Sequence, residues 1–333
     1  MRKTYLDVIR IWACVLVILM HSPMNGTSGA IQNLVYALSG PCIGLFFMVS
    51  GALLLPCEGG WAFVKKRFYK VLAPTLIWTL FYILANILIK HQSVSSLWRQ
   101  ILSIPFSPQG HGILWFMYVL CGLYLLSPII SPWLKTASAK DVRILLCIWG
   151  ITLLFPFLKP YLNIASSPSG GFYYFTGYAG YFLLGFYLTR FEIKISLRNT
   201  ILLAFVAILI IAAVRFTHTA IDFNDAISYL SLPVVMLTIS YFSAMEKIGK
   251  TIRSDSRTAS VLEYLSGLSF GVYLVHIFFI RYLLWDFMPG GLKQILLTVA
   301  ITLLLSFLAS WLISLLPFSR YIIGFKKTKS KKL

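Results

Sequence analysis

Apolar stretches alternate with short polar segments along nearly the whole chain. The apolar stretches are about 17–25 residues long, which is the length an α-helix needs to cross the hydrocarbon core of a bilayer. The sequence has no sustained ten-residue stretches of alternating apolar and polar residues, which membrane β-barrels show. We therefore predict an all-α integral membrane protein, a polytopic bundle of about ten transmembrane helices, at residues 5–22, 34–55, 71–89, 113–131, 142–158, 172–189, 200–216, 227–243, 267–285 and 292–316.

The overall composition supports the membrane assignment. Of the 333 residues, 59% are hydrophobic and 12% are charged, and the mean hydropathy is +0.82, far outside the soluble globular range. The net charge of +19 would suggest a nucleic-acid partner in a soluble protein, but the basic residues cluster between apolar stretches, so no nucleic acid is expected. Five cysteines, an odd number without paired spacing, indicate neither a disulfide framework nor a metal site.

The distribution of Lys and Arg predicts the orientation. These residues concentrate in alternate polar segments, which include both ends of the chain, as the positive-inside rule requires of cytoplasmic segments. We therefore expect a multi-pass protein of the cell membrane, in contact with membrane lipid, with both termini cytoplasmic. Residues 1–333 are expected to form one transmembrane domain with a short basic tail, about 318–333. The amino terminus resembles a signal peptide but lacks a small-x-small cleavage site, so we interpret it as the first helix.

Two ionisable residues, Arg10 and His21, lie in the first predicted helix. Their spacing makes about three helical turns and a rise of roughly 16 Å, so both side chains lie on one face together with Asp7. A buried arginine costs about 2.5–3.5 kcal/mol at the centre of an inserting helix, so it should face the protein interior. The plain alternative is a structural ion pair of Asp7 and Arg10, with His21 ending the helix at the headgroups. We favour a functional site because Arg10 and His21 share one stripe.

These two side chains suit a transfer reaction. Histidine takes up and releases a proton near neutral pH, which suits activation of a hydroxyl nucleophile. A guanidinium nearer the cytoplasm can hold an anionic donor. Their separation of roughly 16 Å is comparable to the reach of a pantetheine arm. The spacing therefore favours, as a hypothesis, a donor whose phosphates stay near the cytoplasmic mouth while its thioester lies deep in the bundle.

Six short motifs follow one another over essentially the whole chain. They are Asp7-Val-Ile-Arg10-Ile-Trp-Ala13 followed by His21, Leu45-Phe-Phe-Met-Val-Ser50-Gly51, Lys66-Arg67-Phe-Tyr-Lys70-Val-Leu-Ala-Pro74, Leu114-Trp115-Phe116-Met-Tyr118, Tyr181-Phe-Leu-Leu-Gly185 and Ser269-Phe-Gly-Val-Tyr273-Leu-Val-His276. In this order, the motifs resemble those of the membrane acyltransferase type 3 family. One departure is Lys70, which stands where the family's basic motif has a second arginine; it keeps the charge but loses the bidentate fork.

The resemblance implies an enzyme that transfers acyl groups other than amino-acyl groups. The family's reaction would be O-acetyl transfer from acetyl-CoA, without a metal, to a hydroxyl of a surface glycan or a lipid-linked sugar precursor. His21 would take the hydroxyl proton, and Arg10 would hold the donor or its developing negative charge. Lys66, Arg67 and Lys70 would bind the donor phosphates. The alternative for this cluster is an ordinary positive-inside flank.

Further candidates for binding the acceptor come from the same motifs. Ser50 and Tyr273 belong to two of them, and His276 lies one turn beyond Tyr273. His276 is either a polar member of the cavity or a core histidine hydrogen-bonded across helices. Trp115 and Tyr118 either stack on a sugar or are ordinary interfacial aromatic residues.

Two other functions remain possible on the residues alone. A transporter of a lipid-linked sugar would use Arg10 and His21 to line a pathway. Transporters often consist of related halves, and the first five predicted helices show no convincing similarity to the last five. A lipid-sugar glycosyltransferase would typically have acidic residues in its first outer loop, and residues 22–33 contain none.

Overall fold

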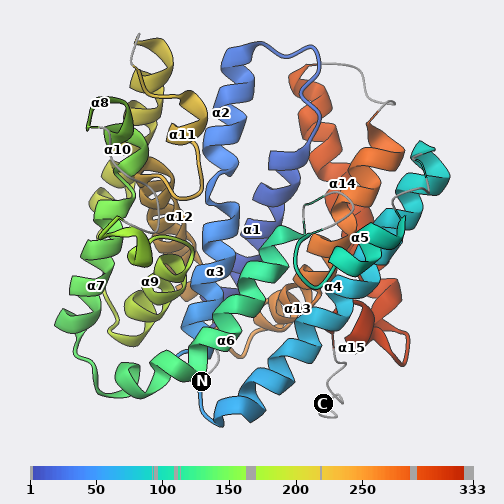
Figure 1. Ribbon diagram of the computed structural model, residues 1–333, viewed down its shortest axis with the longest axis horizontal. Helices are drawn as coiled ribbons and strands as arrows, with labels where there is room; N and C mark the ends of the chain where they lie inside the picture. The colour runs from blue at the N-terminus through green and yellow to red at the C-terminus, as the bar shows by residue number, and fades with distance from the viewer. Residues whose placement is uncertain are drawn as a thin grey trace.

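The computed structural model is a bundle of α-helices (Figure 1). It describes residues 3–91, 93, 97–108, 112, 114–162, 170–217, 220–285 and 291–325, and these residues contain no β-strand. The expected all-α class is confirmed. Residues 326–333 of the predicted basic tail lie outside the described part of the chain.

Seven helical segments in the described ranges are long and apolar enough to cross a membrane. An eighth is possible if α7 (Ala139–Thr152) and α8 (Phe155–Leu162), which are bent by 47° relative to each other, form one broken span. The chain is therefore a multi-pass membrane protein. The seven segments are α1 (Thr4–His21), α2 (Gly29–Ser39) with α3 (Pro41–Leu54), α4 (Gly60–Lys90), α6 (Trp115–Thr136), α10 (Leu197–Phe216), α13 (Arg257–Phe278) with the π-helical turn η3 (Phe279–Leu284), and α14 (Leu292–Ser314).

The predicted count of ten spans is not confirmed, although every predicted span overlaps a helix. Helix α9 (Ala179–Arg190) has 12 residues, which rise about 18 Å and do not cross a hydrocarbon core of about 30 Å. Helix α12 (Leu232–Lys250) is long enough, but its final turns carry Glu246, Lys247 and Lys250. The remaining helical segments are short: α5 (Leu97–Ser103), η2 (Tyr173–Phe175), α11 (Phe223–Ala226) and α15 (Ser319–Ile322).

Several helices begin at residues whose side chains cap the first turn. The hydroxyl oxygens of Ser28, Ser196 and Ser256 accept hydrogen bonds from backbone amides at the starts of α2, α10 and α13. Ser138 and Asp141 form a reciprocal capping box at the start of α7. These local signals set where helices begin, while burial of apolar side chains sets how the helices pack.

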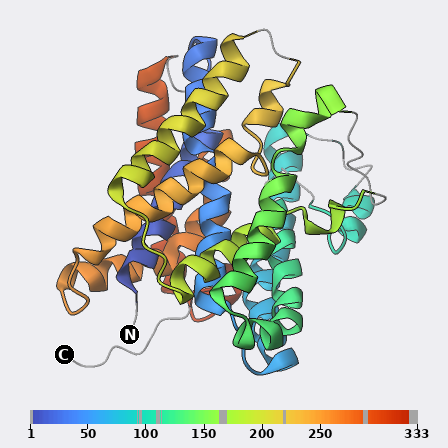
Figure 2. The same ribbon diagram turned by 90° about the vertical axis from the view of Figure 1, so that its left-hand side faces the viewer.

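Helix α1 lies inside the bundle, in contact with α2, α3, α12, α13 and α14 (Figures 1 and 2). Next to it, α3 and α9 cross at very short range. A Cβ atom on Gly51 would lie 1.8 Å from the backbone oxygen of Phe182, and one on Gly185 would lie 1.9 Å from that of Met48. Only glycine fits at these two positions, so the glycines of two of the sequence motifs hold α9 against α3.

The start of α1 and helix α15 lie at the same end of the bundle (Figure 1). Lys3 and Gly324, near the two ends of the described chain, line the same cavity. We call this the basic end, because it also carries Arg67 and Lys70. That the basic end faces the cytoplasm stays a prediction from the charge distribution.

Candidate active site

A cavity of about 590 Å³ opens between the helices at the basic end. Its lining side chains come from α1, α3, α4, α6 and α13, segments that span most of the sequence. The volume lies within the range of about 300–1,000 Å³ that is typical of ligand pockets. The bundle therefore offers one ligand a site that five separate helices build together.

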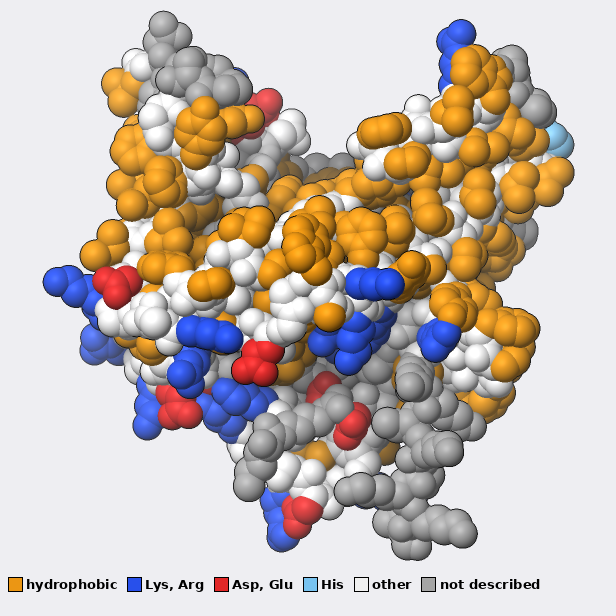
Figure 3. All heavy atoms as spheres, turned by 60° about the horizontal axis from the view of Figure 1, so that its bottom comes forward, with side chains coloured by type: hydrophobic (Ala, Val, Ile, Leu, Met, Phe, Trp, Pro, Cys, Tyr) orange, Lys and Arg blue, Asp and Glu red, His pale blue; other side chains and the backbone are white. Residues whose placement is uncertain are grey.

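The charges in this cavity are mostly positive. Four basic residues line it, Lys3, Arg10, Arg67 and Lys70, against a single acidic one, Asp7. Figure 3 looks toward the basic end, where most of the Lys and Arg side chains in that view gather, while hydrophobic side chains cover much of the rest. A concave site with this excess of cations attracts anions.

Arg67 supplies a second sign of an anion site. Its guanidinium lies over the ring of Phe63, 5.6 Å from the ring centroid. Its Nε atom is buried and has no hydrogen-bond partner among the described residues. A buried donor without an acceptor is unfavourable, so a bound group that supplies an oxygen would improve the energy of this position.

Arg10 lies deeper in the cavity, two turns along α1 from Lys3. The side chain is half-buried, and its Nη1 donates a hydrogen bond to the hydroxyl oxygen of Ser266 on α13, at 3.4 Å. Cys14, one turn further along α1, contacts the backbone oxygen of Ser269 through its sulfur, at 3.6 Å. The predicted polar stripe of α1 therefore faces α13.

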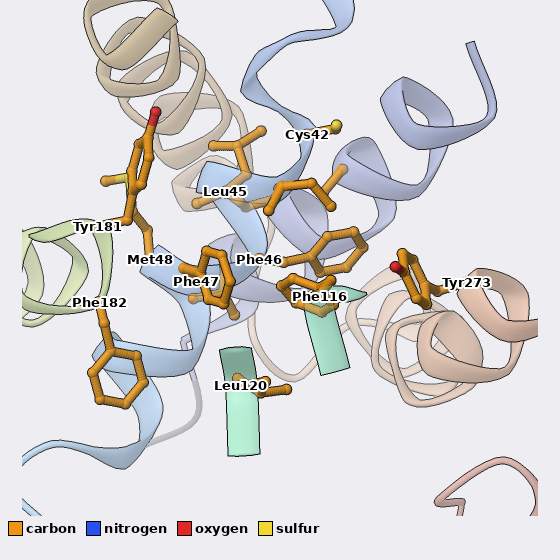
Figure 4. Close-up of a cluster of buried hydrophobic side chains, with 14 of the residues drawn as sticks. Cys42, Leu45, Phe46, Phe47, Met48, Phe116, Leu120, Tyr181, Phe182 and Tyr273 are labelled. Carbon is orange, nitrogen blue, oxygen red and sulfur yellow. The ribbon is translucent and has the colours of Figure 1, made fainter. Parts of the chain in front are cut away.

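Three aromatic rings close the far end of the cavity. Phe46, Phe116 and Tyr273, from α3, α6 and α13, are the lining residues furthest from the basic end on their helices. Their ring centroids lie 5.8 Å (Phe46–Phe116), 5.4 Å (Phe116–Tyr273) and 6.3 Å (Phe46–Tyr273) apart. Figure 4 shows the three rings side by side, each from a different helix. We call them the ring wall.

His21 and His276 lie beyond the ring wall and do not line the cavity. The ring of Tyr273 contacts the ring of His276, with centroids 5.6 Å apart, and the ring of His276 contacts that of His21 at 5.3 Å. His21 Nδ1 is 2.8 Å from the backbone oxygen of Val17. Because a carbonyl oxygen only accepts, the neutral ring carries its proton on Nδ1, and Nε2 has the free lone pair.

The other predicted site residues divide between the cavity and its surroundings. Ser50 lines the cavity, whereas Lys66 is exposed and does not. Tyr118 donates a hydrogen bond to the backbone oxygen of Ile104, at 2.6 Å. Trp115 packs against the rings of Tyr178 and Tyr229, with centroids 5.2 and 5.7 Å away. Trp115 and Tyr118 therefore lie outside the cavity.

The sequence alone did not identify some of the residues that line the cavity. Lys3 gives no signal in the sequence beyond its positive charge, and Ser266 belongs to none of the motifs. A signal for Ser266 exists, because it lies one turn before Ser269 and two turns before Tyr273 on the face of α13 that carries His276. Phe46 and Phe116 lay within motifs, but an aromatic residue in an apolar run gives no sign of lining a cavity.

Comparison with known proteins identifies the type of domain. A family model described as an acyltransferase domain matches residues 3–315, nearly the whole chain. No curated protein and no solved structure matches the chain. The matched range contains the cavity residues on α1, α3, α4, α6 and α13 and the two histidines.

Proposed function

The chain belongs to the acyltransferase 3 family, and from this premise we propose that it transfers an acetyl group from acetyl-CoA to a hydroxyl of a surface glycan or its lipid-linked sugar precursor. The protein is a membrane acyltransferase. The identity of the donor and of the acceptor, and the location in the cell membrane, are the parts that we propose.

The lining of the cavity is the observation that most directly supports acetyl-CoA as the donor. The cavity at the basic end combines four cations with an apolar floor that ends at the ring wall. A coenzyme A thioester has the matching character, with phosphates at one end and an uncharged thioester at the other. The phosphates would pair with Lys3, Arg67 and Lys70, and Arg67 Nε would gain an acceptor.

Arg10 has a different role in this proposal. It lies on the way from the basic rim to the ring wall, where the thioester would follow the phosphates. A planar guanidinium donates several hydrogen bonds in fixed directions. Held by Ser266, it would orient the donor and stabilise the negative charge that develops on the thioester oxygen.

His21 acts as the general base. Its Nε2 lone pair takes the proton of the acceptor hydroxyl while that oxygen attacks the thioester carbon. The C–S bond breaks, its electron pair goes to sulfur, and the proton from His21 then completes the coenzyme A thiol. Because the ring wall separates the cavity from His21, at least one of the three rings has to move for the thioester to reach the base.

A covalent variant uses the same residues. In that variant His21 Nε2 attacks the thioester, an acyl-histidine forms, and the acceptor hydroxyl attacks it in a second step. Incubation with radiolabelled acetyl-CoA in the absence of acceptor separates the two routes. Only the covalent route leaves label on the protein.

The proposed function is tested with the purified full chain in lipid nanodiscs. We expect transfer of radiolabel from acetyl-CoA to surface polysaccharide that has been de-O-acetylated with mild alkali and extracted from the cells of origin. Alkali should release the label again if the product is an O-ester. Binding of acetyl-CoA without any transfer would contradict the acceptor class, and an absence of binding would contradict the donor.

The transporter alternative is not favoured by the family match, which indicates acyl transfer. The same nanodisc preparation also tests it. A transporter would move a lipid-linked sugar across the bilayer and leave acetyl-CoA intact.

A further inference from the structure

His21 and His276 form a close pair that the transfer step proposed above uses only in part. Their ring centroids are 5.3 Å apart at an interplanar angle of 61°, an edge-to-face arrangement. The residues come from α1 and α13 and are separated by 255 positions. The contacts of Arg10 with Ser266 and of Cys14 with Ser269 hold the same two helices in register below the pair.

Both rings have the same tautomer when they are neutral. His276 Nδ1 lies 2.6 Å from the backbone oxygen of Tyr273, as His21 Nδ1 lies 2.8 Å from that of Val17. Since each carbonyl can only accept, each Nδ1 must donate its proton. Each Nε2 therefore carries a lone pair and can accept a proton or a hydrogen bond.

The Nε2 atom of His276 lacks any such partner. The side chain is fully buried, with 0% exposure, and Nε2 has no hydrogen-bond partner among the described residues. Burial of a polar nitrogen without a partner is unfavourable, and most buried polar atoms in proteins have one. A core histidine kept only for packing would gain stability from replacement by an apolar residue of similar size.

The electrostatic surroundings add a reason for a second acceptor. Arg281 on η3 interacts electrostatically with His21. His21 in turn interacts electrostatically with His276. Arg281 is a cation. A proton that arrives on His21 is therefore better accommodated if a neutral neighbour shares it.

We propose that His276 is a positioning residue that shares the catalytic proton with His21 through the Nε2 atoms of the two rings. The inference rests on the proposed acyl transfer. When the hydroxyl O–H bond breaks, the proton binds His21 Nε2, and the rings then rotate out of their edge-to-face arrangement so that the new N–H donates to His276 Nε2. The C–S bond breaks, its electron pair stays on sulfur, and the shared proton moves to the thiolate. Both rings return to their neutral tautomers.

This arrangement stabilises the transition state of the transfer more than it stabilises the resting enzyme. In the resting state His276 Nε2 has no donor, and it gains one only after the proton has left the acceptor hydroxyl. An interaction that forms as charge develops lowers the barrier, while one that is already present in the ground state does not. His276 therefore acts on kcat through His21 without touching the donor.

The kinetic test compares two variants in nanodiscs with acetyl-CoA and the de-O-acetylated polysaccharide. His276→Phe keeps a buried ring but removes both nitrogens, and we expect kcat to fall about 10- to 100-fold with the donor KM within about twofold. His276→Gln keeps an oxygen that can accept the His21 N–H, so it should restore part of the loss. His91→Gln changes an exposed histidine on the end of α4 and serves as the matched control.

A second measurement does not depend on turnover. In nitrogen NMR spectra of the full chain labelled with ¹⁵N-histidine, acidification should shift the Nε2 signals of His21 and His276 together in the wild type. In His276→Gln the His21 signal should shift alone. Independent titration of the two rings, or an unchanged kcat in a folded His276→Phe variant, would overturn the proton-sharing role. Failure of the wild type to transfer acetyl would contradict the proposed function instead, and the NMR result would still decide whether the pair shares a proton.

Discussion

Two regions lie along the same face of α1, the cavity at the basic end and the histidine pair beyond the ring wall. They differ in the chemical character of their side chains. The cavity is open and lined by Lys3, Arg10, Arg67 and Lys70. In the histidine pair His276 is fully buried and His21 is half-buried, and both rings hydrogen-bond only to backbone carbonyls among the described residues. Fixed charges therefore occupy one region, and groups that exchange protons occupy the other.

This difference indicates a division of work along one helix. Fixed cations that stay charged at any physiological pH suit the binding of phosphates. Imidazoles with free lone pairs suit proton transfer, and their separation from the four cavity cations limits how much those cations disfavour protonation of the base. The ring wall between the two regions would hold water away from the thioester until the acceptor arrives. The four predictions below test whether the two regions are separate in function.

The largest effect is expected on the proton-transfer side. His21→Ala removes the proposed base and should lower the rate of acyl transfer by about 10²–10⁴-fold, because general-base catalysis contributes on that order. Binding of acetyl-CoA, measured by isothermal titration calorimetry in nanodiscs, should remain within about twofold of the wild type. Retained turnover in this variant would remove His21 from the reaction, and a loss of donor binding would show that the two regions are not separate.

Arg10→Lys should give the next largest effect, on the cavity side. The substitution keeps the charge but loses the planar fork and, with it, the hydrogen bond to Ser266. Charge-assisted hydrogen bonds contribute about 1.5–3 kcal/mol, so we expect the donor KM to rise about tenfold. Steady-state kinetics with varied acetyl-CoA measure this change. A donor KM equal to that of the wild type would show that Arg10 does not orient the donor.

A matched pair on α4 tests whether position in the cavity matters more than charge near it. Lys70 and Lys66, one turn earlier, are both exposed, but of the two only Lys70 lines the cavity. Lys70→Gln should weaken acetyl-CoA binding about fivefold at low salt and less at high salt, whereas Lys66→Gln should change it less than twofold. Equal effects of the two substitutions would favour a general positive-inside flank over a phosphate site.

The smallest effect concerns the ring wall itself. Phe116→Leu replaces one of its rings with a smaller aliphatic side chain and should raise the hydrolysis of acetyl-CoA without acceptor by about threefold, because water gains access to the thioester. Phe47→Leu is the matched control, since Phe47 contacts the Phe116 ring at 4.7 Å but does not line the cavity. Release of free thiol measures the reaction. Hydrolysis that is unchanged in Phe116→Leu, or raised equally in both variants, would argue that the wall does not exclude water.

Much of the fold was predictable because its signals are local. The apolar stretches placed every helix that is long and apolar enough to span the membrane. The count of ten was not confirmed because hydropathy alone cannot distinguish a crossing helix from a short packed one. Helix α9 is apolar, but it is held against α3 by Gly51 and Gly185 and is only 12 residues long.

For the site, the helical period placed Arg10, Cys14 and His21 on one face, and the structure shows that face packed against α13. The helical period of α1 does not predict that the cavity ends between Arg10 and His21. The rings that close it come from α3, α6 and α13, and no motif spacing relates these helices to one another.

The sequence by itself determined that this protein is a helical membrane acyltransferase and that α1 carries a cation and a histidine on a common stripe. Only the tertiary structure decided which groups meet that stripe: a cavity for Arg10, and His276 for His21. The physical reason is the distance along the chain over which each kind of interaction acts. Hydropathy and helical period act over a few turns of one segment, whereas the contact between residues 21 and 276 depends on how whole helices pack side by side.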